Sequence, residues 1–505
     1  MTLLRRDFIA ASASVAWAAS PAINIDRGRQ LFFDDHLIAD SILQRTWHTP
    51  VIHEASPVLK PETPLEMNGG KQPVACPFSD GVWYDPRERL FKMWYHAGWF
   101  DGIAYATSED GIRWKRPKLD VEPGTNRVLA RREGYARDGV AVWPDWEAAD
   151  PAQRYKMFGY FRRRGAAAVG EVYTSPDGIH WKGPHETSYC GDNTNFYYDA
   201  FRKLWVWSIR PDKDPRGRSR VRREHRDFLA SARWNPEDLL GPVMHPDESD
   251  RPDPAIGVPT QLYHWTAIGY ESVMLGQFMI HFGPDNGVCA KGGFPKTTDV
   301  NIGFSRDGVT WMRSPQRPFI GSSRKVGTWN RGYVHNTGGI CLVVGDKLYF
   351  YFGAWSGASA NKPGGDMYAG GSTGLAVLRR DGFVSMGKNG MLTTRAVAFS
   401  GRHLFVNAAA GGGEVAVEVV GELGFGVKDC VPVRADGTRQ ALRWNSGRDL
   451  SGLTGKALRL RFHLKRAELY SFWVSPDESG ASHGFVAAGG PGLSGSTDTV
   501  GNKVI

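Results

Sequence analysis

The chain has 505 residues, a formal net charge of +9, 61 glycines, 30 prolines and 12% aromatic residues. This length allows two domains, and the composition, with few sustained 3.6-residue periods, favours many short strands over helices. After the N-terminus no stretch approaches eighteen consecutive apolar residues, so no membrane span is expected, and the absence of a binding motif argues against a nucleic-acid partner.

The first residues predict an export signal. Arg5 and Arg6 precede an apolar Ala- and Ser-rich stretch, and residues 16–18 (Ala-Trp-Ala) offer a small-x-small cleavage site. This pattern is typical of twin-arginine signals, so residues 1–20 are predicted to be a signal peptide and the protein to be periplasmic or secreted. Such proteins fold before export in a reducing compartment. Together with five cysteines that form no Cys-x-x-Cys pair, this predicts free thiols rather than a disulfide framework or a zinc cluster.

One phrase, Ser-x-Asp-Gly-x-x-Trp, occurs three times, at residues 108–114, 175–181 and 305–311. Asp-Gly is a strong turn signal because Gly accepts positive φ and the Asp side chain can bind nearby backbone N–H groups. Each copy therefore predicts a β-turn with its Trp buried on the strand that follows. The phrase resembles the Asp-box of sialidases, which is structural and peripheral, so its aspartates are not predicted to be catalytic.

Weaker copies of the phrase raise the number of turn aspartates to five, and each turn follows a strand that alternates aromatic and apolar residues. Their spacing of roughly 50 to 80 residues is typical of one small sheet per repeat. We therefore predict a five-bladed β-propeller over residues 30–394, closed by the apolar strand at 31–38; an ordinary sandwich with chance similarities is the alternative. The five turn positions are Asp110, Asp177, Asp227, Asp307 and Asp381.

The pattern changes after about residue 395. The turn phrase stops, and period-2 stretches such as residues 414–420 and 457–462 follow, separated by turns. This predicts a small C-terminal β-sandwich over residues 395–475. Residues 476–505 are rich in Gly and Ser with few large apolar groups, and are predicted to be a flexible tail.

A five-bladed propeller with these turns, followed by a β-sandwich, resembles glycosidases of the arabinanase, invertase and levansucrase type and their relatives that act on mannosides. The phrases at residues 31–38 (Leu-Phe-Phe-Asp-Asp-His-Leu-Ile), 155–157 (Tyr-Lys-Met), 269–271 (Gly-Tyr-Glu) and 469–472 (Leu-Tyr-Ser-Phe) are similar to those of exported bacterial glycosidase-like proteins. The invertase phrase Trp-x-Asn-Asp-Pro-Asn is absent, which argues against fructan chemistry. The resemblance implies a carbohydrate substrate.

Three acids are the predicted catalytic residues. In a propeller the innermost strands converge on one channel, and glycoside cleavage needs one protonated and one ionised carboxyl group beside the bond. Asp138 and Asp192 lie seven residues before Asp145 and Asp199, two further turn residues, and so at equivalent points of successive blades; Glu271 adjoins a buried strand. We predict Glu271 as general acid, with Asp138 and Asp192 as base and modulator. A structural role as turn residues is the alternative.

Substrate-binding residues are predicted from charge and position. Glu66 competes with Asp80 for the first blade, and the fifth blade offers Arg331, His335 and Asn336. Arginines concentrate at 162–164 and between 210 and 226. Because Arg binds carboxylate or sulfate groups in a bidentate manner, they suggest an anionic glycan or, alternatively, a solvated basic face. The predicted binding residues are Arg210, Arg220, Arg331, His335, Asn336 and Glu66.

These observations predict an exported glycoside hydrolase. One alternative is a non-catalytic carbohydrate-binding propeller. Another is a sialidase-like enzyme, which would need an arginine triad drawn from Arg210, Arg220 and Arg331 together with a Tyr nucleophile. No cofactor is predicted: some of the resembled enzymes hold calcium in the channel, but this sequence has no acidic ligand run of the EF-hand type. The sequence makes no prediction of oligomeric state.

Overall fold

A computed structural model describes residues 21–163, 169–211, 214–215 and 217–501, so the predicted signal peptide lies outside the described residues. The prediction of an all-β protein is confirmed. The described helices are short, and none is long and apolar enough to cross a membrane. They are α1 (Pro64–Met67), α2 (Phe228–Ser231), α3 (Asn286–Gly292) and the 3-10 helices Asn68–Gly70, Pro151–Gln153, Pro236–Asp238 and Ser451–Leu453.

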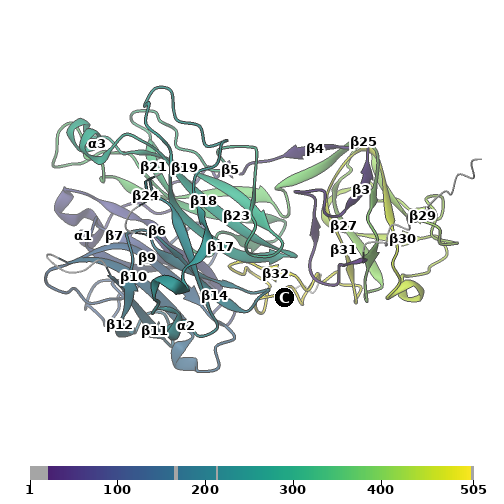
Figure 1. Ribbon diagram of the computed structural model, residues 1–505, viewed down its shortest axis with the longest axis horizontal. Coiled ribbons are helices and arrows are strands. Elements are labelled where there is room, and N and C mark those ends of the chain that lie inside the picture. Colours follow the sequence, from purple (N-terminus) through teal and green to yellow (C-terminus); the bar gives the residue numbers. More distant parts are fainter. Residues whose placement is uncertain (1–20, 164–168, 212–213, 216, 502–505) are drawn as a thin grey trace, which may run out of the picture.

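The larger body in Figure 1 contains five successive groups of antiparallel strands, here called groups one to five. Group one is β6 (Val74–Asp85), β7 (Leu90–Ala97) and β8 (Gly102–Ser108); group two is β9 (Tyr135–Pro144), β10 (Tyr155–Arg163), β11 (Val169–Ser175) and β12 (Lys182–Tyr189); group three is β13 (Asn195–Asp199), β14 (Leu204–Ile209), β15 (Arg220–His225) and β16 (Leu240–Met244). Group four is β17 (Gln261–Glu271), β18 (Val273–Gly283), β19 (Thr297–Ser305) and β20 (Met312–Arg313); group five is β21 (Gly332–Asn336), β22 (Leu342–Val344), β23 (Lys347–Trp355) and β24 (Gly371–Arg379), to which the short β5 (Val51–Ile52) adds.

The first strands of neighbouring groups lie against each other: β6 against β9, β9 against β13, and β13 against β17. β21 then contacts both group four and β6. The last group also joins the first through a parallel pairing of β24 with β6, at Gly371 with Val74 and Ser372 with Ala75. Because these strands are covered on both faces, all twelve residues of β6 are buried.

The Ser-x-Asp-Gly-x-x-Trp phrase forms the same turn at each of its three sites. Oδ1 of Asp110, Asp177 and Asp307 accepts the backbone N–H groups two and three residues ahead, over 2.7–2.8 Å. In each turn the Ser hydroxyl also accepts the Gly N–H, over 2.8–2.9 Å. The turns lie at the outer ends of their groups, between β8 and the chain that follows it, β11 and β12, and β19 and β20.

The carbonyl oxygen of each turn glycine accepts a hydrogen bond from the preceding group. Trp94 of group one donates to Gly178 of group two over 2.7 Å, and Arg202 of group three reaches Gly308 of group four at 3.5 Å. Tyr351 of group five donates to the carbonyl oxygen of Gly111 in group one. The turn phrase therefore connects group one with group two, group three with group four, and group five with group one.

A second body contains a nine-stranded sheet built from both ends of the chain (Figure 1). The N-terminal strands pair with β25 and β31 there, so residues 31–38 do not join the fifth group as predicted. The reason is that β31 is sixteen residues long and pairs along its length with β2, β25, β27 and β28, while β25 in turn pairs with β3 and β4. The strands are β2 (Gln30–Leu31), β3 (Ile38–Ser41), β4 (Gln44–Trp47), β25 (Val384–Thr394), β27 (His403–Ala409), β28 (Glu414–Val419), β29 (Cys430–Val431), β30 (Asp436–Trp444) and β31 (Leu460–Ser475), beside the parallel pair β1 (Ile23–Asn24) and β26 (Val397–Ala398).

Residues 476–501 differ from the predicted flexible tail. β32 (Phe485–Val486) pairs with the end of β17, and Ala481, Val486, Ala488 and Asp498 are buried. Small residues allow this segment to pack closely against other backbone, which compensates for its lack of large apolar groups. All five cysteines are buried and free of disulfides, in agreement with the thiol prediction.

The turn glycines provide a test of this fold. Gly178 has φ +79°, and a Cβ there would lie 2.5 Å from Cζ2 of Trp94. Gly124 has φ +84°, and a Cβ there would meet no atom within 4 Å. We expect Gly124→Ala to cost about 1 kcal/mol of unfolding free energy through φ alone, and Gly178→Ala about 2–4 kcal/mol through φ and the clash. Urea denaturation of both variants measures this difference, and equal losses would contradict the packing of Trp94 on this turn.

Candidate functional site

Side chains from four groups meet near the start of the first strands. Oγ of Ser79 lies 3.0 Å from Nε2 of His264, and Nε2 of His335 lies 3.2 Å from Oδ1 of Asn193. The ring of Phe78 lies 4.1 Å from the ring of His335. Groups one, three, four and five therefore each contribute to one place, which we call the candidate site. Two of its predicted members, His335 and its neighbour Asn336, are both buried there.

Group two contributes Asp138, a predicted catalytic residue. The register between β9 and β10 shifts so that Asp138 and Gly139 together face Tyr160, a bulge of the kind that redirects side chains beside functional sites. Asp138 is only 3% exposed. Burial and the nearby Asp192 charge raise the pKa of Asp138 to about 6, although Arg162 and Arg137 oppose the shift.

Asp138 and Asp192 share one guanidinium group. Nε of Arg162 donates to Oδ2 of Asp138 over 2.6 Å, and its Nη2 donates to Oδ2 of Asp192 over 3.3 Å. Burial alone would raise the pKa of Asp192, but Arg210, Arg218 and Arg162 outweigh it and hold that pKa below its ordinary value. The structure thus brings two of the three predicted acids together, with pKa values moved in opposite directions.

A third acid, Asp80, forms an ion pair with Arg137, the residue before Asp138, and is fully buried. Its carboxylate also accepts a hydrogen bond from the N–H of Phe78 over 2.6 Å. Burial raises the pKa of Asp80 in spite of the Arg137 charge. Nε and Nη1 of Arg137 have no hydrogen-bond partner among the described residues. Sequence reasoning named Asp80 as an alternative to Glu66, and the structure favours Asp80 as the acid nearest to the site.

The histidines of the site are neutral. Burial lowers the pKa of His335 to about 3, with Arg137 and Lys296 adding to the effect. Burial and His335 also hold the pKa of His264 well below its ordinary value. Neutral imidazoles offer one donor and one acceptor each, which suits sugar hydroxyls and does not suit proton donation at neutral pH.

A buried lysine completes the site, and sequence reasoning missed it. Nζ of Lys296 donates to the hydroxyl of Tyr263 over 2.9 Å, and that hydroxyl lies 3.2 Å from the hydroxyl of Tyr333. Lys296 also lies 4.6–5.7 Å from the ring centroids of Tyr263, Tyr333 and Tyr368. Nothing in its sequence context, a single Lys ahead of a strand, distinguishes it. Only the folded chain brings it to these rings.

Glu271 lies elsewhere. It is the last residue of β17, with φ +50°, and its carboxylate binds Arg380 at 3.0 Å, Arg29 at 3.4 Å and the Ser482 hydroxyl at 2.7 Å. His264 and Glu271 are separated by seven residues of one strand, or about 23 Å. The structure therefore does not bring Glu271 to Asp138 and Asp192. We leave it out of the proposed site.

The hydrogen bonds of Glu66 also give it a structural role. It lies at the third position of α1 and accepts the N–H groups of Glu62 and Thr63 over 2.9 and 3.0 Å. Tyr95 and Arg116 occupy its other oxygen, over 2.6 and 2.7 Å. The sequence Thr63-Pro-Leu-Glu66 is a readable capping box. Since both oxygens are fully used, Glu66 is left out of the proposed site as well.

The predicted arginines do not form a triad. Arg210 pairs with Asp192, whereas Arg220 is 1% exposed and donates to backbone carbonyls of Ser219 and Tyr263. Burial, with Arg210 nearby, lowers the pKa of Arg220 to about 9. Arg331 lies 5.7 Å from the ring of Phe294 instead. The arrangement required by the sialidase-like alternative is therefore not assembled from these three residues.

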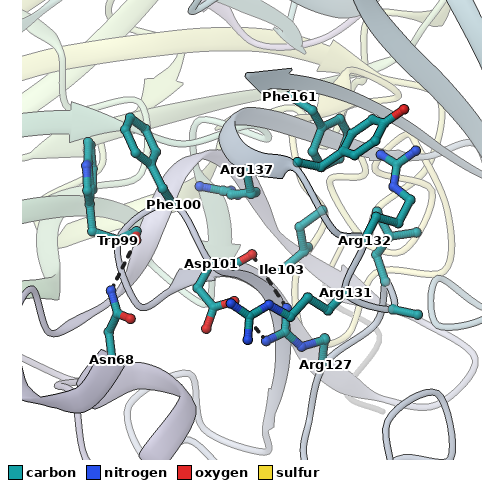
Figure 2. Close-up of a pocket in the computed structure, with 13 residues that line it drawn as sticks. Asn68, Trp99, Phe100, Asp101, Ile103, Arg127, Arg131, Arg132, Arg137 and Phe161 are labelled. Carbon is teal, nitrogen blue, oxygen red and sulfur yellow. Dashed lines mark hydrogen bonds and ion pairs between the residues drawn. The ribbon is translucent and has the colours of Figure 1, made fainter. Parts of the chain in front are cut away.

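A cavity of about 210 Å³ opens next to the site (Figure 2). Phe100 connects the two, because it lines the cavity and its ring centroid lies 5.2 Å from the guanidinium of Arg162. Within the described part of the chain, no cluster of His, Cys, Asp and Glu has metal-binding geometry. We define the arginine cavity by its lining residues, Asn68, Trp99, Phe100, Asp101, Ile103, Arg127, Leu129, Ala130, Arg131, Arg132, Tyr135, Arg137 and Phe161.

No model of a known protein family matches this sequence, and no curated protein matches it. Solved structures similar to the chain include a thermostable family-43 glycoside hydrolase (12% identity, 65% of this chain and 97% of that chain, TM-score 0.41). A second is an N-acetylgalactosamine deacetylase from F. plautii in complex with blood group B trisaccharide (13% identity, 71% of this chain and 96% of that chain, TM-score 0.41). A third is a putative glycoside hydrolase from Bacteroides ovatus (14% identity, 66% of this chain and 96% of that chain, TM-score 0.42). Likenesses of this extent assign no role to any residue here.

The surroundings of Glu271 predict a structural role. Removing it leaves Arg29 and Arg380 buried with one carboxylate fewer, so we expect Glu271→Ala to lower the unfolding free energy by about 3–5 kcal/mol. Urea denaturation measures the loss, with Glu109→Ala as the matched control, because the exposed Glu109–Lys115 pair contributes little. A Glu271→Ala protein of unchanged stability would contradict this role.

Proposed function

We propose that this protein is a glycoside hydrolase in which Asp138 is the general acid and Asp192 is the second, ionised carboxylate. The observation that carries the proposal is that two carboxylates from neighbouring groups bind one half-exposed guanidinium group, that of Arg162, in surroundings that raise the pKa of Asp138 and lower that of Asp192. Environments that separate the pKa values of two neighbouring acids are the usual basis of acid and base roles. The proposal replaces Glu271 as the predicted acid.

The chemistry follows from these protonation states. Protonated Asp138 donates its proton to the glycosidic oxygen as the bond to the anomeric carbon breaks, and ionised Asp192 acts on the opposite side as base or nucleophile. Their shared contact with one guanidinium keeps the two carboxyl groups within the ~5–10 Å that glycosidases use. Arg162 is 49% exposed in its side chain, so a sugar that enters can displace it from between the acids.

The architecture that we propose for this function is a five-bladed β-propeller over the five groups, with the nine-stranded sheet as a C-terminal β-sandwich. The proposal is supported by the contact between the first strands of successive groups and by the two contacts that return from group five to group one. In such a ring the first strands surround one channel, and the candidate site lies where they meet.

We also propose that the protein is exported and acts outside the cytoplasm on a carbohydrate. The twin-arginine pattern of the N-terminus supports this, and so do five buried free thiols, because a chain folded before export needs no disulfides. A non-catalytic carbohydrate-binding protein would use the same site. It would have no need for two carboxyl groups with separated pKa values, and we therefore prefer the hydrolase.

Substitution of the two acids tests the proposal. Asp138→Asn and Asp192→Asn are each expected to lower kcat/KM at least a hundredfold on a polysaccharide found to be cleaved in a reducing-sugar screen. Asp138→Asn should leave stability at pH 8 unchanged or raised, because the raised pKa means that the fold disfavours the ionised form. Asp120→Asn, at an exposed Asp–His pair, is the matched control. Full activity in either test variant would overturn the assignment.

The pH dependence tests which acid donates the proton. Activity requires protonated Asp138, so kcat/KM should fall as pH rises through about 6. Arg162 lowers the pKa of Asp138; an Arg162→Gln variant should therefore move this basic limb to higher pH. A pH–rate profile of both proteins provides the measurement. A limb that stays in place, or that moves to lower pH, would contradict the role of Asp138.

A further inference from the structure

The arginine cavity carries more positive charge than its own acids can balance. Of its thirteen lining residues four are arginines and one, Asp101, is acidic. Figure 2 shows the guanidinium group of Arg137 directed toward Phe100, with Arg127 and Arg131 on the side of Asp101 and Arg132 near Phe161. The arginines thus approach the cavity from different sides.

Acids behind the lining hold two of these arginines in place. Arg127 pairs with Asp101 at 3.1 Å and with Glu122 at 2.8 Å. Arg132 forms two bonds to Glu171, of 2.6 and 3.1 Å. Neither Glu122 nor Glu171 lines the cavity. Such pairs orient a guanidinium group and leave its remaining N–H groups available to a ligand.

The buried N–H groups of Arg137 point independently to a ligand. Its side chain is 1% exposed, it lines the cavity, and Nη2 pairs with Asp80. Nε and Nη1 have no partner among the described residues. Buried guanidinium donors without acceptors are costly, and an oxyanion in the cavity would satisfy both of them. Phe100 lines the cavity and also contacts Arg162 of the candidate site, so such an oxyanion would lie in a cavity that adjoins the site.

The size and the walls of the cavity fit a sugar. At about 30 Å³ per water molecule, a volume of 210 Å³ has room for roughly seven waters, or for one monosaccharide unit. Trp99, Phe100, Tyr135 and Phe161 provide apolar surface for its C–H face. Trp99 is itself fixed by stacking on Tyr368, with 4.1 Å between the ring centroids.

We propose that the arginine cavity binds the negatively charged group of an acidic sugar unit, a carboxylate or a sulfate ester, and so makes the protein selective for anionic glycans. This inference rests on the proposed function, since it treats the cavity as a subsite next to Asp138 and Asp192. Arg137 and Arg131 supply the N–H donors. Arg127 and Arg132 add positive charge, and the aromatic side chains contact the sugar ring.

Free monosaccharides test the proposal without any turnover. Isothermal titration of the full chain compares glucuronate, glucose 6-sulfate and glucose, none of which has a glycosidic bond to cleave. We expect at least one of the anions to bind ten times more tightly than glucose, and the preferred anion identifies the charged group as carboxylate or sulfate. Glucose binding as tightly as both anions, or no binding of either anion, would overturn the proposal.

Two variants connect that binding to the cavity. Arg131→Gln changes an exposed arginine and is expected to weaken binding of the preferred anion about tenfold without affecting folding. Arg137→Lys keeps a charge for Asp80, loses the Nε and Nη1 donors, and should weaken binding as much or more. Arg113→Gln, 91% exposed in the turn beside Asp110, is the matched control. Unchanged affinity in the Arg131→Gln protein would contradict the assigned cavity.

Failure of this inference and failure of the proposed function are distinguishable. Anion binding that persists while Asp138→Asn keeps full activity on every cleaved glycan would reject the proposed acid and retain the subsite. Conversely, a protein that needs Asp138 for cleavage but binds neither anion would retain the function and lose the subsite.

Discussion

The carbonyl oxygen of the turn glycine is the point on which the arrangement of the strand groups depends. In each complete copy of the phrase, the Asp side chain closes the turn by accepting two backbone N–H groups. A side chain of the preceding group then donates to the glycine carbonyl. Because Tyr351 of the last group makes this bond to Gly111 of the first, a local turn chemistry also closes the ring of contacts.

The buried acids of the protein have charged partners of two kinds, fully buried and half-exposed. Glu271 contacts Arg29 and Arg380, two buried arginines, and Asp381 and Asp498 complete a network without exposed groups. Asp138 and Asp192 instead share Arg162, whose side chain is half exposed. A fully buried network is suited to stability, whereas a half-exposed shared cation keeps two carboxyl groups close and still leaves them open to a substrate. This contrast, rather than burial alone, separates the structural acid from the proposed catalytic ones.

Sequence reasoning found what local chemistry determines. The Asp-Gly turns followed from φ and side-chain acceptors, and the equal distances to Asp145 and Asp199 located Asp138 and Asp192 at equivalent points. It could not place Glu271, because the position of the acid along an eleven-residue strand depends on which end of that strand faces the site. Glu66 was predicted to bind substrate although its capping box, which gives it a structural role, could be read from the sequence. Lys296 and Arg137 acquire their surroundings only from residues distant in the sequence, and no local signal marks them.

β17 connects the candidate site with the Glu271 network. Near its start, His264 contacts Ser79 in the candidate site, and at its end Glu271 binds Arg29 and Arg380. Arg29 precedes β2 in the nine-stranded sheet, and Asp498 of the C-terminal segment binds Arg380. The second body and both chain ends therefore anchor one end of the strand whose other end positions His264. Loss of the Glu271 network would disturb the candidate site through β17, even though the proposed catalytic acids do not lie near Glu271.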